Sequence, residues 1–277
     1  MKEAGLLKNR PIYHLDTQAD LERAVRKLVR GDPRLRPILQ QAGMPGLRRR
    51  PAGFAGLAAI VVGQQLSIAS ASSIWSRLEV AFDPFHHDAL LRSRADKLAR
   101  LGLSAAKIKT LKHIAQEIAE ERLNLDALAD LGADEAHRTL TSLHGVGPWT
   151  ADIYLLFCLG HGDAWPAGDL AVQEAMRIGL NLTSRPTAKE MSPLAEDWRP
   201  LRGVAAHLWW AYYKVARKRD GAPVPEAIMS VDTALPTSDR RANQLNPSSQ
   251  AQREQVSDPV PTARERRTTS ERHRHRT

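Results

Sequence analysis

The stretch Gly145-Val146-Gly147, which lies between two apolar segments, constrains the fold of this chain more than any other. Residues 134–143 before it and 150–159 after it both have helical periodicity. Two glycines with one residue between them permit a tight connection and let backbone approach a partner closely. Pro148 follows where a helix tolerates proline best, in its first turn. The pattern therefore predicts a helical hairpin over residues 134–159.

The start of the second hairpin helix has a chemical property of its own. The first N–H groups of a helix have no partner within it, and here they would point outward beside the glycines. Such helix starts bind anions, and phosphate is a natural candidate. An ordinary packed corner between two helices is the alternative interpretation, so the rest of the chain must decide between them.

Charge and cysteine content narrow the classes of function. The formal net charge of +9 favours a polyanionic partner, although an arginine-rich composition alone can produce it. Cys158 is the single cysteine, which excludes an intramolecular disulfide and a cysteine-ligated iron–sulfur cluster. No apolar run reaches membrane-spanning length, and no secretory signal pattern is present. We therefore expect an intracellular protein without a membrane partner, in bacterial cytoplasm or nucleoid or in a eukaryotic nucleus.

Helical periodicity recurs along the chain and no segment alternates like a strand, so we expect an all-α fold. We divide the chain into a short lead at residues 1–16, a helical domain at 17–219 and a basic tail at 220–277. The tail is dominated by Pro, Ser, Thr, Gln and Arg and lacks apolar periodicity, which predicts disorder.

Asp169 ends a loop rich in glycine and proline, residues 160–168, and precedes a predicted helix at 170–180. This is an N-cap position, where the helix end favours an ionised carboxylate. Capping alone would explain the residue. A fixed carboxylate can also stabilise positive charge that develops in a reaction.

Other polar side chains have less specific interpretations. Gln64 and Gln65 interrupt an apolar run at a glycine, and they fit either contact with DNA bases or a helix end facing water. The segment Arg48–Arg50 fits phosphate contacts and a solvated loop equally well. Lys107 and Lys112 are interpreted as part of a solvated helix face.

Taken together, the Gly-x-Gly hairpin, the carboxylate twenty residues after Trp149, the Gln-Gln break and the ending Trp198-Arg-Pro-Leu-Arg202 resemble one known family. They are similar to the helix-hairpin-helix base-excision DNA glycosylases, in the branch of 3-methyladenine DNA glycosylase II. The resemblance covers roughly residues 17–218. It implies two helical subdomains with the active-site cleft between them and a monomer that acts on damaged double-stranded DNA.

The resemblance also implies residue roles. Asp169 matches the catalytic carboxylate, and Trp149 and Trp210 match the walls of the base pocket, although core packing would also explain the tryptophans. Gln65 matches the residue that fills the gap left by a flipped nucleotide, with the departure that the alkylation branch has leucine there. The remaining DNA contacts fall on Gly145, Val146, Gly147 and Thr150. A monovalent cation can bind the family hairpin through backbone carbonyls, here those of Thr141, Leu143 and Val146; no other cofactor is expected.

The hairpin position occupied by Trp149 separates two reaction types. Members that cleave the DNA strand carry a lysine there, which attacks C1′, whereas an indole cannot act as that nucleophile. The resemblance thus predicts a monofunctional glycosylase that hydrolyses alkylated purines such as 3-methyladenine from DNA and starts base excision repair. A glycosylase for deaminated or oxidised bases and a non-catalytic DNA-binding protein are the alternatives.

Overall fold

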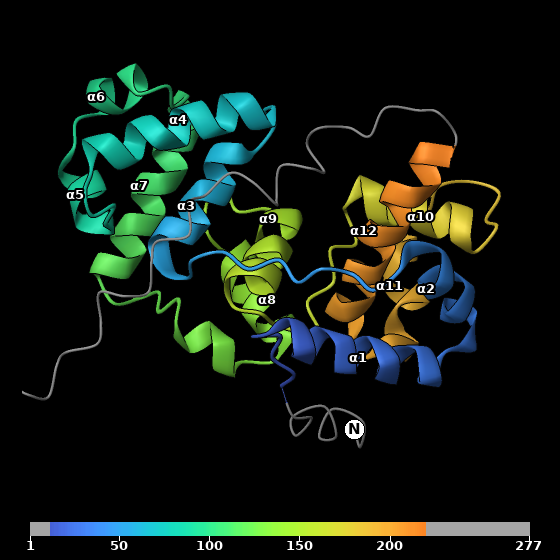
Figure 1. The fold of residues 1–277 in the computed structure, drawn as a ribbon. Coiled ribbons are helices and arrows are strands. Elements are labelled where there is room, and N and C mark those ends of the chain that lie inside the picture. The colour runs from blue at the N-terminus through green and yellow to red at the C-terminus, as the bar shows by residue number, and fades with distance from the viewer. Residues whose placement is uncertain (1–11, 220–277) are drawn as a thin grey trace, which may run out of the picture. The chain divides into compact units, whose positions relative to one another are not determined.

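The computed structural model of the protein describes residues 12–219, and these residues form helices without a β-strand among them (Figure 1). The expectation of an all-α fold is thus confirmed. The predicted tail at 220–277 and most of the predicted lead lie outside the described residues. Within residues 12–219, no helix is both long and apolar enough to cross a lipid bilayer.

Helices from the two ends of the described chain pack together. Their bounds are α1 (Gln18–Gly31), η2 (Pro33–Leu35), α2 (Arg36–Ala42), α10 (Leu170–Gly179), α11 (Ala188–Leu194), η5 (Glu196–Trp198) and α12 (Arg202–Arg219). Helix α12 contacts α1, α2 and α10, so the last helix forms the centre of this group (Figure 1). Capping boxes begin two of its members: Thr17 with Asp20 at α1, and Thr187 with Glu190 at α11.

A second group comes from the middle of the chain. It comprises α3 (Gly53–Gly63), α4 (Ile68–Ala81), α5 (His87–Arg92), α6 (Ala95–Arg100) and α7 (Ala105–Ala119). Helix α7 contacts α3, α5 and α6, while α3 also contacts α4. Most of α3 is apolar and buried, which makes it the inner helix of this group.

The predicted hairpin connects to the second group. After the short helix η3 (Ala127–Asp130), it consists of α8 (Ala133–Thr141), α9 (Pro148–Ile153) and a π-helical turn, η4 (Tyr154–Cys158). Helix α9 contacts α8 and α3, and η4 contacts α3. All five residues of η4 are buried, so the hairpin is anchored by its second helix. The helical grouping agrees with the two predicted helical subdomains.

Two lysines differ from their interpretation as a solvated face. Lys107 Nζ donates hydrogen bonds to the carbonyl oxygens of Val62 at 2.7 Å and Gln64 at 2.9 Å. Lys112 Nζ donates to the carbonyl oxygens of Leu91 and Ser93. Both ammonium groups therefore satisfy carbonyls at the ends of α3 and α5, where helices leave them without partners.

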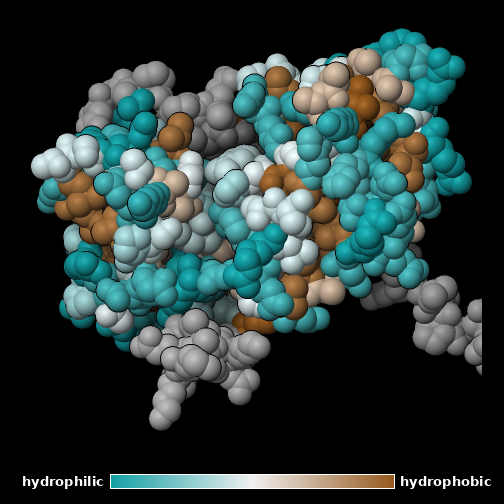
Figure 2. Space-filling view, turned by 180° about the vertical axis from the view of Figure 1, so that it is seen from behind, coloured by the Kyte–Doolittle hydropathy of each residue, from teal (hydrophilic) through white to brown (hydrophobic). Residues whose placement is uncertain are grey.

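The surface is mostly hydrophilic on the face drawn in Figure 2, with hydrophobic side chains in separate small patches. Among the described residues, three large hydrophobic side chains are exposed: Met44, Val80 and Leu170. Leu170 is 60% exposed and directly follows Asp169, so it lies beside the candidate site.

Candidate active site and nucleic-acid interface

Asp169 occupies the N-cap of α10, as the sequence predicts. Its Oδ1 atom accepts hydrogen bonds from the amide N–H groups of Ala171 at 3.0 Å and Val172 at 3.1 Å. The preceding loop is held by a bond from Gln173 Nε2 to the Ala167 carbonyl oxygen at 2.8 Å. The carboxylate is therefore fixed by local structure while its residue remains partly exposed.

Both predicted pocket tryptophans contact this carboxylate. Trp149, from α9, donates its indole N–H to Asp169 Oδ2 at 2.9 Å. Trp210, from α12, donates its indole N–H to Asp169 Oδ1 at 3.0 Å. One side chain from the hairpin and one from the last helix thus converge on the carboxylate at the start of α10.

The two indoles differ in how open they are. Trp149 is partly buried, whereas Trp210 is 2% exposed. The Trp210 ring packs with the rings of Phe157 and His207, at centroid distances of 5.4 and 5.9 Å. The guanidinium carbon of Arg48 lies 5.3 Å from the Trp210 ring centroid, a cation–π contact. Arg48 thus packs on an indole, an arrangement that neither interpretation of the arginine segment includes.

The two hairpin glycines are required for different reasons. Gly145 has a φ of +79°, and a Cβ atom there would lie 1.9 Å from Thr110 Oγ1 on α7. Glycine is therefore needed at 145 by both conformation and packing. Gly147 has an extended backbone at the start of α9, and a Cβ atom there would meet nothing within 4 Å. The space beside Gly147 is open to an external partner.

Val146 and Thr150 are both buried, so little of either residue faces solvent at the hairpin. The Thr150 hydroxyl accepts a hydrogen bond from Gln64 Nε2 at 2.8 Å, and the same amide donates to the Gly145 carbonyl oxygen at 3.4 Å. Gln64 thereby ties the turn after α3 to the hairpin. This contact between distant segments leaves no pattern in the sequence.

Gln65, the predicted wedge, is exposed and has a φ of +55°. A left-handed backbone is uncommon for a residue with a side chain, so the tertiary structure fixes this turn. The hydrogen bonds from Lys107 to the end of α3 and from Gln64 to the hairpin hold the turn on both sides. Gln65 is thus presented to solvent from a constrained turn.

Other carboxylates near the hairpin are paired with charged groups. Asp152 in α9 lies 2.9 Å from His137 Nδ1 in α8. Burial raises the pKa of Asp152 to about 6, while the hydrogen bond that His137 donates to the Asp152 carboxylate raises the pKa of His137. Asp163 accepts hydrogen bonds from the guanidinium groups of Arg199 and Arg202 at about 3 Å. The first pair joins α9 to α8. The contacts of Asp163 join the loop after the hairpin to the segment that begins α12.

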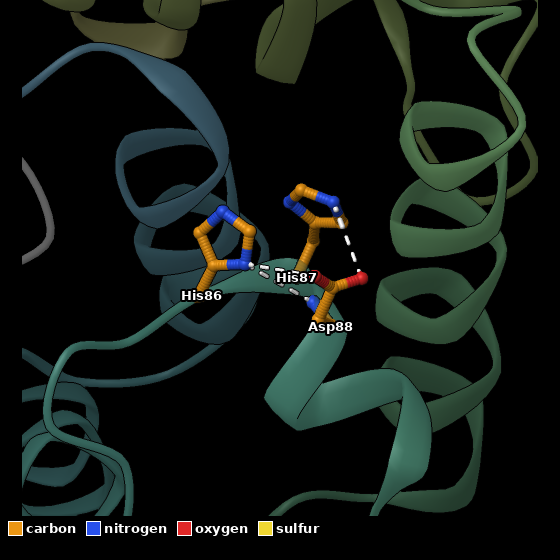
Figure 3. A group of neighbouring side chains, drawn as sticks. All are labelled: His86, His87 and Asp88. Atoms are coloured by element: carbon orange, nitrogen blue, oxygen red, sulfur yellow. Dashed lines mark hydrogen bonds and ion pairs between the residues drawn. The ribbon is translucent and has the colours of Figure 1, made fainter.

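A separate polar cluster, His86, His87 and Asp88, lies at the start of α5 (Figure 3). His86 Nδ1 accepts the Asp88 amide N–H, and the carboxylate lies 3.6 Å from His86 Nδ1 and 3.5 Å from His87 Nε2. Burial lowers the pKa of His87. The two histidines line a cavity of about 710 Å³ between α3, α5 and the segment 121–126, which contains none of the predicted site residues. His86 is the N-cap of α5.

Comparison with known proteins places these features in a family. A relative from Mycobacterium tuberculosis, a probable bifunctional transcriptional activator and DNA repair enzyme, is 35% identical over 209 residues, covering 70% of this chain and 40% of the relative. A DNA-3-methyladenine glycosidase structure from Bacillus halodurans superposes with a TM-score of 0.64 at 25% identity, over 80% of this chain and 99% of that one. The chain thus spans less than half the length of the mycobacterial relative.

A third comparison includes nucleic acid. The 3-methyladenine DNA glycosylase of Schizosaccharomyces pombe, solved in complex with abasic DNA, has a TM-score of 0.60 at 25% identity and covers 68% of this chain and 95% of that one. Residues 58–200, which include the hairpin and Asp169, match the sequence model of the HhH-GPD superfamily of base excision DNA repair proteins. The chain therefore belongs to the HhH-GPD superfamily of base excision DNA repair proteins.

Proposed function

We propose that this protein is a monofunctional DNA glycosylase that flips out alkylated purines such as 3-methyladenine from duplex DNA and excises them by hydrolysis. The observation that carries the proposal is the carboxylate of Asp169, fixed by two backbone amides and two indole N–H groups beside the hairpin. Relatives named as 3-methyladenine glycosylases support the substrate class.

The proposed reaction breaks the bond between C1′ of the deoxyribose and the nitrogen of the damaged base. The electron pair of that bond leaves with the base, and positive charge develops on the sugar. The Asp169 carboxylate stabilises that charge and receives the proton of the water whose oxygen bonds to C1′. The products are free base and an abasic site in an intact strand.

The absence of strand cleavage is part of the proposal. The residue at the hairpin position is Trp149, whose N–H already donates to Asp169 and which has no amine to form an imine. Lys107 does carry an amine, but its ammonium group is bonded to two carbonyl oxygens at the end of α3. Water is therefore the proposed nucleophile.

We propose that the protein binds damaged duplex DNA as a monomer. Backbone groups of Gly145 and Gly147 would contact phosphate, since the space beside Gly147 is open. A base within a duplex has to leave the stack to react, and Gln65 is the proposed residue that fills the gap. Its exposed position on a constrained turn supports this role.

We also propose a monovalent cation at the hairpin, held by the backbone carbonyls of Thr141, Leu143 and Val146. The Leu143 carbonyl oxygen accepts the Val146 N–H at 3.1 Å, and its second lone pair suits a hard cation. Such a cation would add positive potential where a phosphate approaches. DNA affinity should then be higher in potassium than in a bulky organic cation at equal ionic strength; equal affinities would argue against the site.

The experiment that tests the function is a panel of duplexes, each with one defined lesion, assayed for release of free base. We expect release of 3-methyladenine and other alkylated purines. Release of deaminated or oxidised bases alone would show that these bases, and not alkylated purines, are the substrates. Tight binding without release from any duplex would support a DNA-binding protein in place of an enzyme.

A further inference from the structure

The two oxygens of the Asp169 carboxylate have unequal surroundings. Oδ1 accepts from Ala171 N, Val172 N and Trp210 Nε1, whereas the bond to Oδ2 comes from Trp149 Nε1. An ionised carboxylate offers about two lone-pair sites on each oxygen. Three donors therefore occupy Oδ1 fully, whereas one donor from residues 12–219 leaves Oδ2 with a site for water or for the charged sugar.

Trp210 contacts this carboxylate through its N–H edge and not through an open ring face. Its residue is 2% exposed, and Phe157, His207 and Arg48 pack on the indole. A flipped base cannot stack on a ring that is covered in this way without displacing those side chains. Trp149, in contrast, is partly exposed and can contact both the carboxylate and a bound base.

We infer that Trp210 is a positioning residue: its indole N–H fixes Oδ1 of Asp169 so that Oδ2 is the oxygen that faces C1′ and the attacking water. This inference rests on the proposed glycosylase function and assigns Trp210 a role different from that of a pocket wall. Oδ2 therefore accepts the indole N–H of Trp149 and also faces the substrate. Trp210 acts on the reaction only through Asp169.

The neighbouring residue Trp209 provides a matched control. It belongs to the same helix, is 0% exposed, and its indole nitrogen has no hydrogen-bond partner among the described residues. Trp210→Phe and Trp209→Phe therefore remove similar volume from α12, and Trp210→Phe also removes a bond to Asp169. The difference between the two variants isolates the N–H group.

The experiment measures single-turnover base release and damaged-duplex affinity for both variants, at a temperature where both are folded by circular dichroism. We expect Trp210→Phe to lower the rate at least ~10-fold with affinity within about twofold, as expected for loss of an interaction used in the transition state. Trp209→Phe should lower the rate less than about threefold. If Trp210→Phe does not fold, a tryptophan analogue with sulfur in place of the indole N–H at position 210 removes the donor and keeps the shape.

A double-mutant cycle makes the test specific for action through the carboxylate. In an Asp169→Asn background, Trp210→Phe should change the residual rate by less than about twofold. Equal losses in the two backgrounds, or equal losses for the two tryptophan variants, would overturn the inference. If the unmodified protein releases no base from any duplex, the proposed function itself fails, an outcome distinct from both.

Discussion

Asp163 and Asp169 lie in one loop, six residues apart, and their carboxylates have different partners. Asp163 is buried and accepts from two arginine side chains, Arg199 and Arg202. Asp169 is partly exposed, and the donors found for it are uncharged amide and indole N–H groups. The negative charge of Asp163 is balanced by the fold, whereas the charge of Asp169 remains available to a cation that develops beside it.

The largest expected effect concerns the nucleophile, because a covalent protein–DNA adduct either forms or does not form. If the carboxylate and water perform the reaction, borohydride should trap no covalent protein–DNA adduct during base release, because no imine forms. An enzyme of the same superfamily with a hairpin lysine serves as the positive control. Efficient trapping of this protein on damaged DNA would show that an amine attacks C1′, and Lys107→Ala would then be the variant to examine.

The next contrast concerns stability. Arg202→Met leaves Asp163 with Arg199 as its remaining arginine and also removes a bond to Asp134. Breaking a buried ion pair typically costs about 3 kcal/mol, so we expect urea unfolding to report a loss of that order. Base release per folded molecule should change little. A variant as stable as the parent would mean that the arginine network is not needed to hold the hairpin.

The Asp152–His137 pair predicts a pH dependence of stability. Burial raises the pKa of Asp152 to about 6, so the folded protein binds a proton more tightly than the unfolded chain does. The contribution of Asp152 to the free energy of unfolding is therefore fully present below the pKa of the unfolded chain, near 4, and is lost as pH rises towards about 6. The raised pKa of His137 acts in the same direction at higher pH, because protonated His137 is favoured in the folded state.

Asp152→Asn isolates this effect. Relative to the variant, the parent protein should lose about 2 kcal/mol of unfolding free energy between pH 4 and pH 6.5, measured by urea titration at each pH. A constant difference between the two proteins across that range would contradict the raised pKa of Asp152.

The smallest expected effect is at Gly147. A Cβ atom there meets nothing within the protein, so Gly147→Ala should change the unfolding free energy by less than about 1 kcal/mol. It should weaken duplex binding by about threefold at low salt, because the methyl group occupies the space proposed for a phosphate. Unchanged affinity, or affinity of the parent protein that does not fall with added salt, would argue against backbone contacts at the hairpin.

Local signals made much of this fold predictable. The capping boxes at Thr17 and Thr187 and the N-cap at Asp169 lie within a few residues of the groups they bond, so sequence spacing reveals them. Other elements leave weaker signals: α5 is six residues long, too short for periodicity, and the π-helical turn η4 follows α9 without a break in apolar pattern.

The resemblance to a known family named Trp149, Asp169 and Trp210 as site residues, and the structure brings these three side chains together. The sequence could not reveal that both indoles donate to one carboxylate, that Arg48 covers Trp210, or that Gln64 holds the hairpin. Each of these contacts joins segments far apart in the chain and depends on how the helices pack.

In the proposed reaction the charge of Asp169 is used, unlike that of Asp163. The most direct test compares single-turnover base release by Asp169→Asn and Asp163→Asn, per folded molecule and on one alkylated duplex. We predict that Asp169→Asn loses at least ~10²-fold in rate, comparable with removal of one strong electrostatic contact, while still binding damaged DNA. Asp163→Asn should be less stable and lose less than about threefold in rate. Full activity of Asp169→Asn, or equal losses in the two variants, would contradict the assignment of Asp169 as the catalytic carboxylate.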